Sequence, residues 1–209
     1  FLGWHADRSP HFYRFGYKES FALIQNPTQT PFPSPQGNLQ LSLVSSAEQL
    51  DTLGIPQTGL LPHKDVWYLK RRYFSFPYQQ YEVWAIQDQT SFQGYLVTRT
   101  VEVPEYGTSV LRIVDFIGTP ETLGNLGNAI DTLIQSKQVE YADCYCAGIS
   151  AEIFAQAGFL PRHPEDSVVV PNYLTPPLLE NTEYYYFTNH PENFVLFKAD
   201  GDQDRPNIE

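Results

Sequence analysis

Methionine is absent from this chain of 209 residues, and the first residue is Phe1. Such a sequence is expected of a fragment, of a processed chain, or of a chain from which modified methionines have been dropped. In the last case some spacings would be short by one residue. Compact motifs are therefore the more secure basis for prediction.

Basic residues are scarce, because 13 Lys and Arg stand against 24 Asp and Glu and leave a formal net charge of −11. Nucleic-acid backbones and anionic membrane surfaces bind clusters of Lys and Arg. We therefore exclude both as partners. The sequence also has no run of about 20 apolar residues, the length that spans a bilayer, and no charged-then-apolar leader. It predicts a soluble, cytoplasmic protein without membrane insertion.

Cysteine and histidine are sparse too. Cys144 and Cys146 lie two residues apart on a predicted strand, so both side chains should point to one face of a sheet. We interpret them as small buried residues in a reducing compartment, with a redox or metal pair as the alternative. The histidines lack the spacing of metal ligands, so we predict no metal site; they are His5, His11, His63, His163 and His190.

The residues that are abundant indicate a globular, strand-rich protein, because 42% of the chain is hydrophobic and 15% is aromatic. A chain of this length forms one domain or one and a half, and buries about 70% of the surface of its unfolded form.

Four segments divide the chain. Residues 1–27 are aromatic and strand-like, and are either the end of a preceding half-domain or an N-terminal arm that pairs with a sheet edge. Residues 28–38 form a proline-rich linker, and residues 39–198 form the main domain. Residues 199–209 begin like a calcium-binding loop at Asp200 but lack its later ligands, so a solvated acidic tail is predicted.

The periodicity of apolar residues predicts an alternation of strands and helices. Strands are predicted at 39–44, 81–86, 94–103, 110–117, 140–146, 168–170, 184–187 and 194–197. Helices are predicted at 46–50, 65–73, 120–135 and 150–157, the first capped by Ser45 or Ser46 and the third by Thr119. The second, third and fourth strands form an antiparallel meander, and the crossover helix 120–135 implies a parallel pair of strands.

This order of elements resembles the GNAT superfamily of acyl-CoA N-acyltransferases. The sharpest local match is AEIFAQAGF at 151–159, in which Gly158 and Phe159 keep the ending of the family's last helix. The aromatic and basic helix at 67–73 further resembles one half of a double-GNAT protein, a group that includes peptide- and sugar-modifying transferases. The resemblance implies an α/β (α+β) fold, with a mixed, mostly antiparallel twisted sheet, a central parallel strand pair and flanking helices.

The resemblance also implies acetyl-CoA or another acyl-CoA as co-substrate and a small-molecule amine as acceptor. The CoA phosphates would lie where strand 110–117 meets the next helix, because free amides and the helix dipole attract phosphate. The positions concerned are Ile117, Gly118, Thr119 and Thr122. At this position the family's loop is basic and glycine-rich. In this chain, by contrast, Pro120 lacks an amide proton and Glu121 adds negative charge. An ordinary capped helix start is the alternative interpretation.

The tyrosine that often serves the family as general acid corresponds to Phe154, which has no proton to donate. Tyr145 on the neighbouring strand is the nearest replacement, with a packing role in the core or an interface as the alternative.

Asp115 lies among apolar residues of a predicted strand, so its carboxylate must be paired, neutralised or functional. Arg112 is three residues away and is therefore expected on the opposite face, which leaves Arg99 or backbone amides as partners. An ion pair or amide clamp is one interpretation, and a general base or substrate-amine site is the other. Asp143 has the same two interpretations, and two carboxylates on adjacent strands would suit an amine.

These features predict an N-acyltransferase that moves an acyl group from acyl-CoA to an amine, such as an amino sugar or a peptide. Its candidate catalytic residues are Asp115, Asp143 and Tyr145. The alternative is a catalytically silent GNAT-like domain that acts as a structural or substrate-binding module. A partner could be a second GNAT half or a second copy of the chain.

Overall fold

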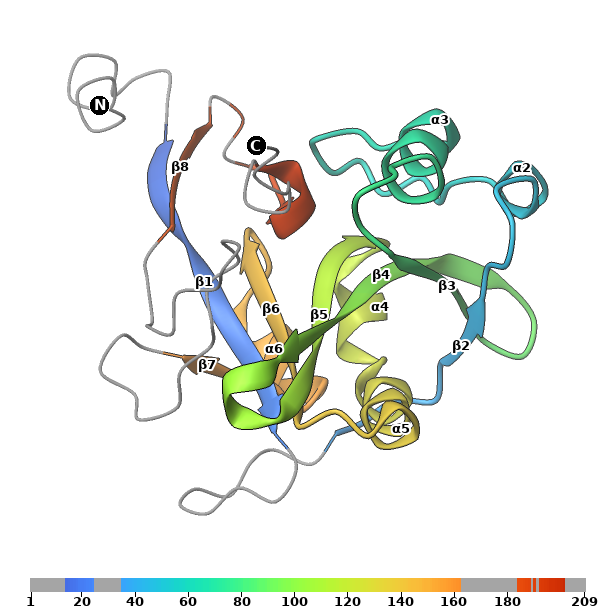
Figure 1. Cartoon of the computed structure of the whole chain (residues 1–209). Coiled ribbons are helices and arrows are strands. Elements are labelled where there is room, and N and C mark those ends of the chain that lie inside the picture. The colour runs from blue at the N-terminus through green and yellow to red at the C-terminus, as the bar shows by residue number, and fades with distance from the viewer. Residues whose placement is uncertain (1–13, 25–34, 163–183, 189, 191, 202–209) are drawn as a thin grey trace.

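The structure, a computed structural model, describes residues 14–24, 35–162, 184–188, 190 and 192–201. Nine strands form one sheet in the order β2-β3-β4-β5-β6-β1-β7, with β8 paired to β1 and β9 paired to β6 (Figure 1). The strands are β1 (Arg14–Ile24), β2 (Gln40–Leu43), β3 (Glu82–Gln87), β4 (Phe92–Val103), β5 (Thr108–Ile117), β6 (Tyr141–Ala147), β7 (Leu160–Arg162), β8 (Tyr184–Thr188) and β9 (Leu196–Phe197). The helices are α2 (Gln49–Leu53), α3 (Val66–Leu69), α4 (Pro120–Gly124), α5 (Gly127–Lys137) and α6 (Ala151–Gln156). Three short helical turns are η1 (Lys70–Phe74), η2 (Pro104–Tyr106) and η3 (Lys198–Asp200).

The predicted fold class is confirmed. Among the described strands, β5 and β6 pair in parallel and the other pairs run antiparallel. The antiparallel meander β3-β4-β5 and the crossover from β5 through α4 and α5 to β6 both occur where the sequence predicts them. The predicted strand at 168–170 lies outside the described residues.

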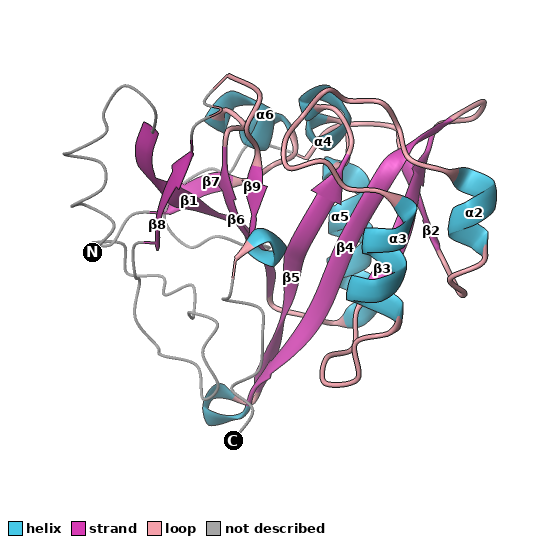
Figure 2. Cartoon of the chain, turned by 90° about the horizontal axis from the view of Figure 1, so that it is seen from above, coloured by secondary structure: helices cyan, strands magenta, loops and turns pink. Residues whose placement is uncertain are grey.

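Helices cover both faces of the sheet (Figure 2). The larger core cluster joins one face to α4, α5 and α6, and includes Leu123, Ile130 and Phe154. The smaller cluster joins the other face to α2, α3 and η1, and includes Leu50 and Leu69. Cys144 and Cys146 are both buried on the larger-cluster face, as their spacing predicts.

The crossover helix is two helices, not the single one that the sequence predicts. The break at residues 125–126 accommodates the end of the proline-rich segment, because the amide of Asn128 donates to Gln36 O at 3.2 Å. At Gly127 a Cβ atom would lie 2.7 Å from Gln36 N, and Gly37, at φ +109°, lies against the carbonyl of Asn125. These close backbone contacts require glycine at both positions.

Two further helix predictions need correction in detail. The second helix begins at Val66 and not at Asp65, whose carboxylate caps it by accepting from Tyr68 N at 2.7 Å. Its last part, η1, has π-helical hydrogen bonding, with Ser75 N donating to Lys70 O. In α2 the cap residue is Glu48, and neither Ser45 nor Ser46 caps the helix as predicted.

The N-terminal strand β1 pairs with β6, β7 and β8, and so lies inside the sheet. Whether it belongs to this domain or to a preceding half-domain stays a prediction, as do the other predicted domain boundaries.

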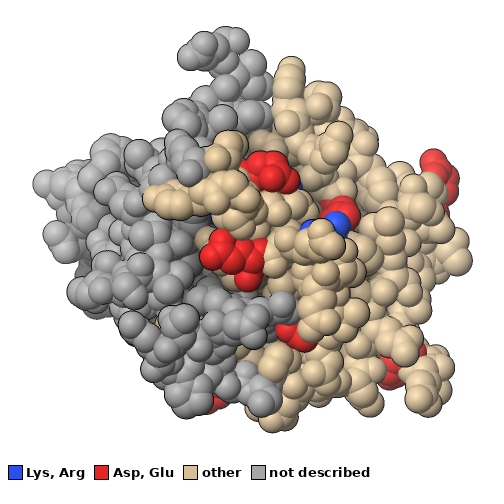
Figure 3. Space-filling model, turned by 60° about the horizontal axis from the view of Figure 1, so that its bottom comes forward, with Lys and Arg blue, Asp and Glu red and all other residues tan. Residues whose placement is uncertain are grey.

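The view in Figure 3 shows acidic side chains at several separate places and basic ones in one small area, in keeping with the net charge of −11. Within the described part of the chain, no helix is long and apolar enough to cross a membrane.

Candidate functional site

A β-bulge in β5 decides which residues share a face of the sheet. Val97 of β4 lies opposite Asp115 and Thr98 lies opposite Ile113, so Val114 is the extra residue. The alternation of side chains is therefore reset, and Arg112 and Asp115 lie on the same face. The prediction that they lie on opposite faces is wrong, because it assumed a regular strand.

Asp143 and Tyr145 of β6 share this face, since Ala142, Cys144 and Cys146 point to the other one. The structure thus brings the three predicted catalytic residues to one side of the sheet. All three are buried, with at most 1% of each residue exposed.

Asp115 is held by a network of buried side chains. The ammonium group of Lys64 contacts its Oδ1 atom and lies 3.0 Å from Oδ2 of Asp200. The hydroxyl group of Tyr73 donates to Asp115 Oδ2 at 2.5 Å, and the amide of Phe116 donates to Oδ1 at 2.9 Å. The carboxylate is therefore an ion-pair partner, which was one of its two interpretations, although Lys64 and not Arg99 supplies the charge.

Burial and charge shift the titration of this network in a consistent way. Burial lowers the pKa of Lys64, but the carboxylates of Asp115 and Asp200 outweigh it and hold that pKa above its ordinary value. Burial raises the pKa of Asp115 against the opposing effect of Lys64. Burial and the nearby Asp115 carboxylate also raise the pKa of Tyr73, so its hydroxyl stays protonated and donates.

Tyr68 extends the network toward the surface, with its hydroxyl oxygen 3.4 Å from that of Tyr73. Asp200 is fixed from the other side, because its Oδ2 atom accepts from Phe197 N at 2.8 Å. Its side chain is only 5% exposed.

Asp143 has a separate partner. Its Oδ2 atom lies 3.2 Å from Nε of Arg112, which is directly opposite it on the parallel strand. Tyr145 lies two residues after Asp143 on β6, and the ammonium group of Lys198 is 5.9 Å from the centroid of its ring. The two predicted carboxylates are therefore each engaged by a basic side chain of the chain itself.

The space between the two parallel strands is filled by β9. Strands β5 and β6 pair only at 111–113 and 142–144, and then diverge. Strand β1 occupies the far edge of β6, so β9, which pairs with residues 146–147, must lie on the edge that faces β5. Ligands of open α/β sheets bind at the carboxyl ends of such strands. Here the ring of Phe197 lies in that region, 6.0 Å from the ring of Phe116.

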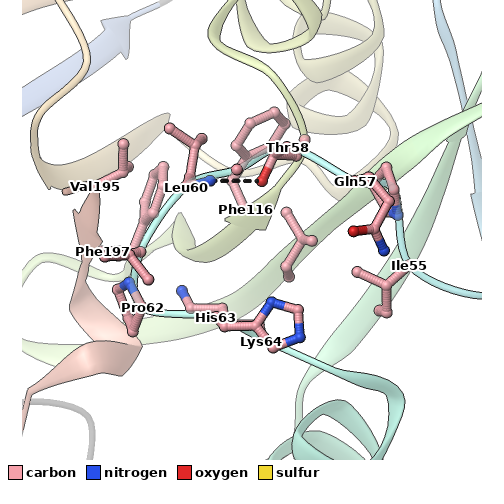
Figure 4. Close-up of a pocket in the computed structure, with 15 residues that line it drawn as sticks. Ile55, Gln57, Thr58, Leu60, Pro62, His63, Lys64, Phe116, Val195 and Phe197 are labelled. Atoms are coloured by element: carbon pink, nitrogen blue, oxygen red, sulfur yellow. Dashed lines mark hydrogen bonds between the residues drawn. The ribbon is translucent and has the colours of Figure 1, made fainter. Parts of the chain in front are cut away.

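A small cavity remains at the end of β5 (Figure 4). Its volume is about 110 Å³, and it is lined by residues 55–64, 116–118, Val195 and Phe197. Two of the predicted cofactor positions, Ile117 and Gly118, form part of its wall. Drug-sized ligands occupy pockets of roughly 300–1,000 Å³, so this cavity accepts only a small group.

At the predicted phosphate position, part of the hydrogen-bonding capacity of the helix start is used within the chain. The side chain of Thr119 accepts from Thr122 N at 3.3 Å, and Pro120 has no amide proton. The next helix offers no better place, because Gln36 O accepts from the amide of Asn128. The amides of Thr122 and Asn128 are thus used by the chain itself, which is also the arrangement of an ordinary capped helix start.

Comparisons with known proteins give a fold-level likeness only. A scan against protein families finds no match, and neither does a sequence search of curated proteins. Among solved structures, a functionally unknown conserved protein from Staphylococcus epidermidis is similar at 11% identity and a TM-score of 0.47, over 90% of this chain and 67% of that one.

Two other similar structures are GCN5-related N-acetyltransferases. The one from Anabaena variabilis has 14% identity and a TM-score of 0.41, over 75% of this chain and 40% of that one. The one from Kribbella flavida has 11% identity and a TM-score of 0.40, over 76% of this chain and 60% of that one. The chain thus spans between 40% and 67% of the length of these three proteins.

Sequence reasoning missed Lys64, Tyr73 and Asp200. Lys64 and Tyr73 contact Asp115, and Asp200 contacts Lys64. Tyr73 belongs to the predicted aromatic and basic helix. Its side chain is buried in the π-helical turn η1, which the sequence did not predict. Lys64 precedes the cap residue Asp65 in a loop, where nothing in the local pattern signals a buried cation.

Proposed function

We propose that this chain is a GNAT-like domain that does not hold acyl-CoA itself and that serves an N-acyltransferase as a structural or acceptor-binding unit. The observation that carries the proposal is that Thr119 accepts from the amide of Thr122 in α4 and Gln36 accepts from the amide of Asn128 in α5. A second GNAT half would then hold the co-substrate.

Two further features support the proposal. The gap between β5 and β6 contains β9, so an extended co-substrate has no open path along the strands. Asp115 and Asp143 are buried and engaged by Lys64 and Arg112, so neither carboxylate is available to take a proton from an amine without breaking an ion pair.

Titration calorimetry of the full chain with acetyl-CoA tests the proposal. We expect no saturable heat up to millimolar ligand. Saturable binding at lower concentrations would overturn it. As a control for access, Phe197→Ala removes the ring that lies in the gap between the strands. Under the proposal this variant still fails to bind acetyl-CoA, because the engaged amides are unchanged.

A second candidate function, complete N-acyl transfer by this chain, is favoured by one observation. The cavity lies beside Gly118 at the carboxyl end of β5, where a small acyl group would fit. Under this alternative acetyl-CoA binds, and Gly118→Ala weakens binding, because a Cβ at this position would lie 2.6 Å from the Phe116 ring and reshape the wall of the cavity. Unchanged binding in this variant would argue against the cavity as the site.

A further inference from the structure

Strand β2 presents an unpaired edge. It is the last strand of the described sheet and pairs only with β3. The amide of Val44 donates to Val83 O at 2.8 Å, so in an antiparallel ladder the backbone groups of Leu41 and Leu43 point away from β3. Protein sheets usually protect such an edge with Lys, Pro or a bulge, and the sequence of β2, QLSL, has neither residue type.

A groove of about 300 Å³ lies beside this edge. It runs between α2 and the sheet, and is lined by Ser42, Leu43, Val44, Gln49, Thr52, Leu53, Ala85 and Gln87. Leu43 is 52% exposed, which is high for a leucine in a strand. An open strand edge next to a groove for side chains is the arrangement by which sheets bind extended peptides.

The charges around the groove select the kind of partner. Glu48, Asp51 and Asp88 each adjoin a residue of its lining, whereas the basic residue beside them, Lys70, is paired with Asp51 at 2.6 Å. The rim is therefore net acidic. A second copy of the chain would bring a further charge of −11 to this rim, which disfavours self-pairing and favours a basic segment.

We propose that the edge of β2 and its groove bind an extended, basic segment of another protein. The segment adds to β2 as an antiparallel strand, exchanges hydrogen bonds with the backbone of Leu41 and Leu43, and places alternate apolar side chains in the groove. Its Lys or Arg residues lie beside Glu48 and Asp88. This partner surface lies on the α2 side of the sheet edge and is independent of the proposed function.

Two blocked eight-residue peptides test the proposal, one that alternates valine with lysine and one that alternates valine with glutamate. Each is titrated into the full chain and followed by backbone amide NMR. We expect the lysine peptide to bind saturably, to shift the amides of Leu41 and Leu43 most, and to bind at least about tenfold more tightly than the glutamate peptide. Equal affinity of the two peptides, or shifts confined to other elements, would overturn the proposal.

A pair of variants separates backbone pairing from side-chain contact. Leu43→Pro removes the outward N–H without removing a hydrogen bond to β3, and we expect it to abolish binding of the lysine peptide. Leu43→Ala keeps the N–H and is expected to retain most of the affinity. If Leu43→Pro does not fold, Glu48→Gln replaces it and weakens the lysine peptide alone. Unchanged binding in the variant used would count against a basic partner. So would a concentration-dependent dimer of the wild-type chain that the peptide does not dissociate.

Discussion

Replacing Lys64 by methionine is the most direct perturbation of the buried network. Methionine fills a similar volume, but it removes the cation that, within the described residues, contacts both Asp115 and Asp200. Asp115 is 0% exposed, so water cannot replace the lost ammonium group. We therefore expect Lys64→Met to destabilise the folded state strongly.

The magnitude follows from the burial of both partners. Removing one member of a buried ion pair costs about 3–5 kcal/mol, because the other charge stays buried without compensation. For a domain of about 150–250 residues, each kcal/mol lowers Tm by about 2–4 °C, so the variant should melt about 6–20 °C below the wild type. Raising the pH should not reproduce this loss below pH 10.5, because the raised pKa of Lys64 keeps the ammonium charged there.

Thermal and urea unfolding measure the effect, and Lys70→Met is the matched control. Lys70 contacts Asp51 at a similar distance, 2.6 Å, but the two side chains are 32% and 59% exposed. An exposed pair contributes about 0–1 kcal/mol, so the control should lose little. The reasoning is refuted if Lys64→Met unfolds within about 1 kcal/mol of the wild type, or if both variants lose the same free energy.

Three further changes test other contacts. Tyr73→Phe removes the hydroxyl that donates to Asp115 and should cost about 1.5–3 kcal/mol in urea unfolding; a cost near zero would show that the hydroxyl is not needed. Gly127→Ala places a methyl group 2.7 Å from Gln36 N and should cost about 1–3 kcal/mol, whereas a stabilised variant would contradict the close packing. The pKa of Asp88 is lowered to about 2 by hydrogen bonds from the β3–β4 turn, so its contribution to stability is present above pH 3.8 and lost as pH falls toward 2. Asp88→Asn should flatten this acid dependence of Tm, and an unchanged slope would refute the assignment.

The order of elements could be predicted from the sequence because each element carries its own pattern. The hairpin β3-β4 and strand β5 show alternation, and Thr119 caps the crossover helix as expected. The buried carboxylates were also predictable, since a charged residue in an apolar strand needs a partner wherever the strand lies. Their partners were not predictable, because Lys64 is 51 residues away from Asp115 in the chain.

Two of the errors have one physical origin, which is that local periodicity was assumed to continue through irregular backbone. The bulge at Val114 reversed the predicted relation between Arg112 and Asp115. The break before Gly127 divided a helix whose apolar face is otherwise continuous. In both places the irregularity serves a distant contact, either the approach of Lys64 to the sheet or the approach of Gln36 to the helix, so no local pattern announces it.

The bulge and the break both serve contacts within the chain and leave the apolar core of this fold class in place. The bulge places Asp115 on the face where Tyr73 and Lys64 already lie, so the carboxylate is used to fix the loop at 55–64 and the turn η3 against the sheet. The break lets Gln36 take the amide at the start of α5. Each irregularity serves a contact that the chain makes to itself, while the packed faces of the sheet stay continuous.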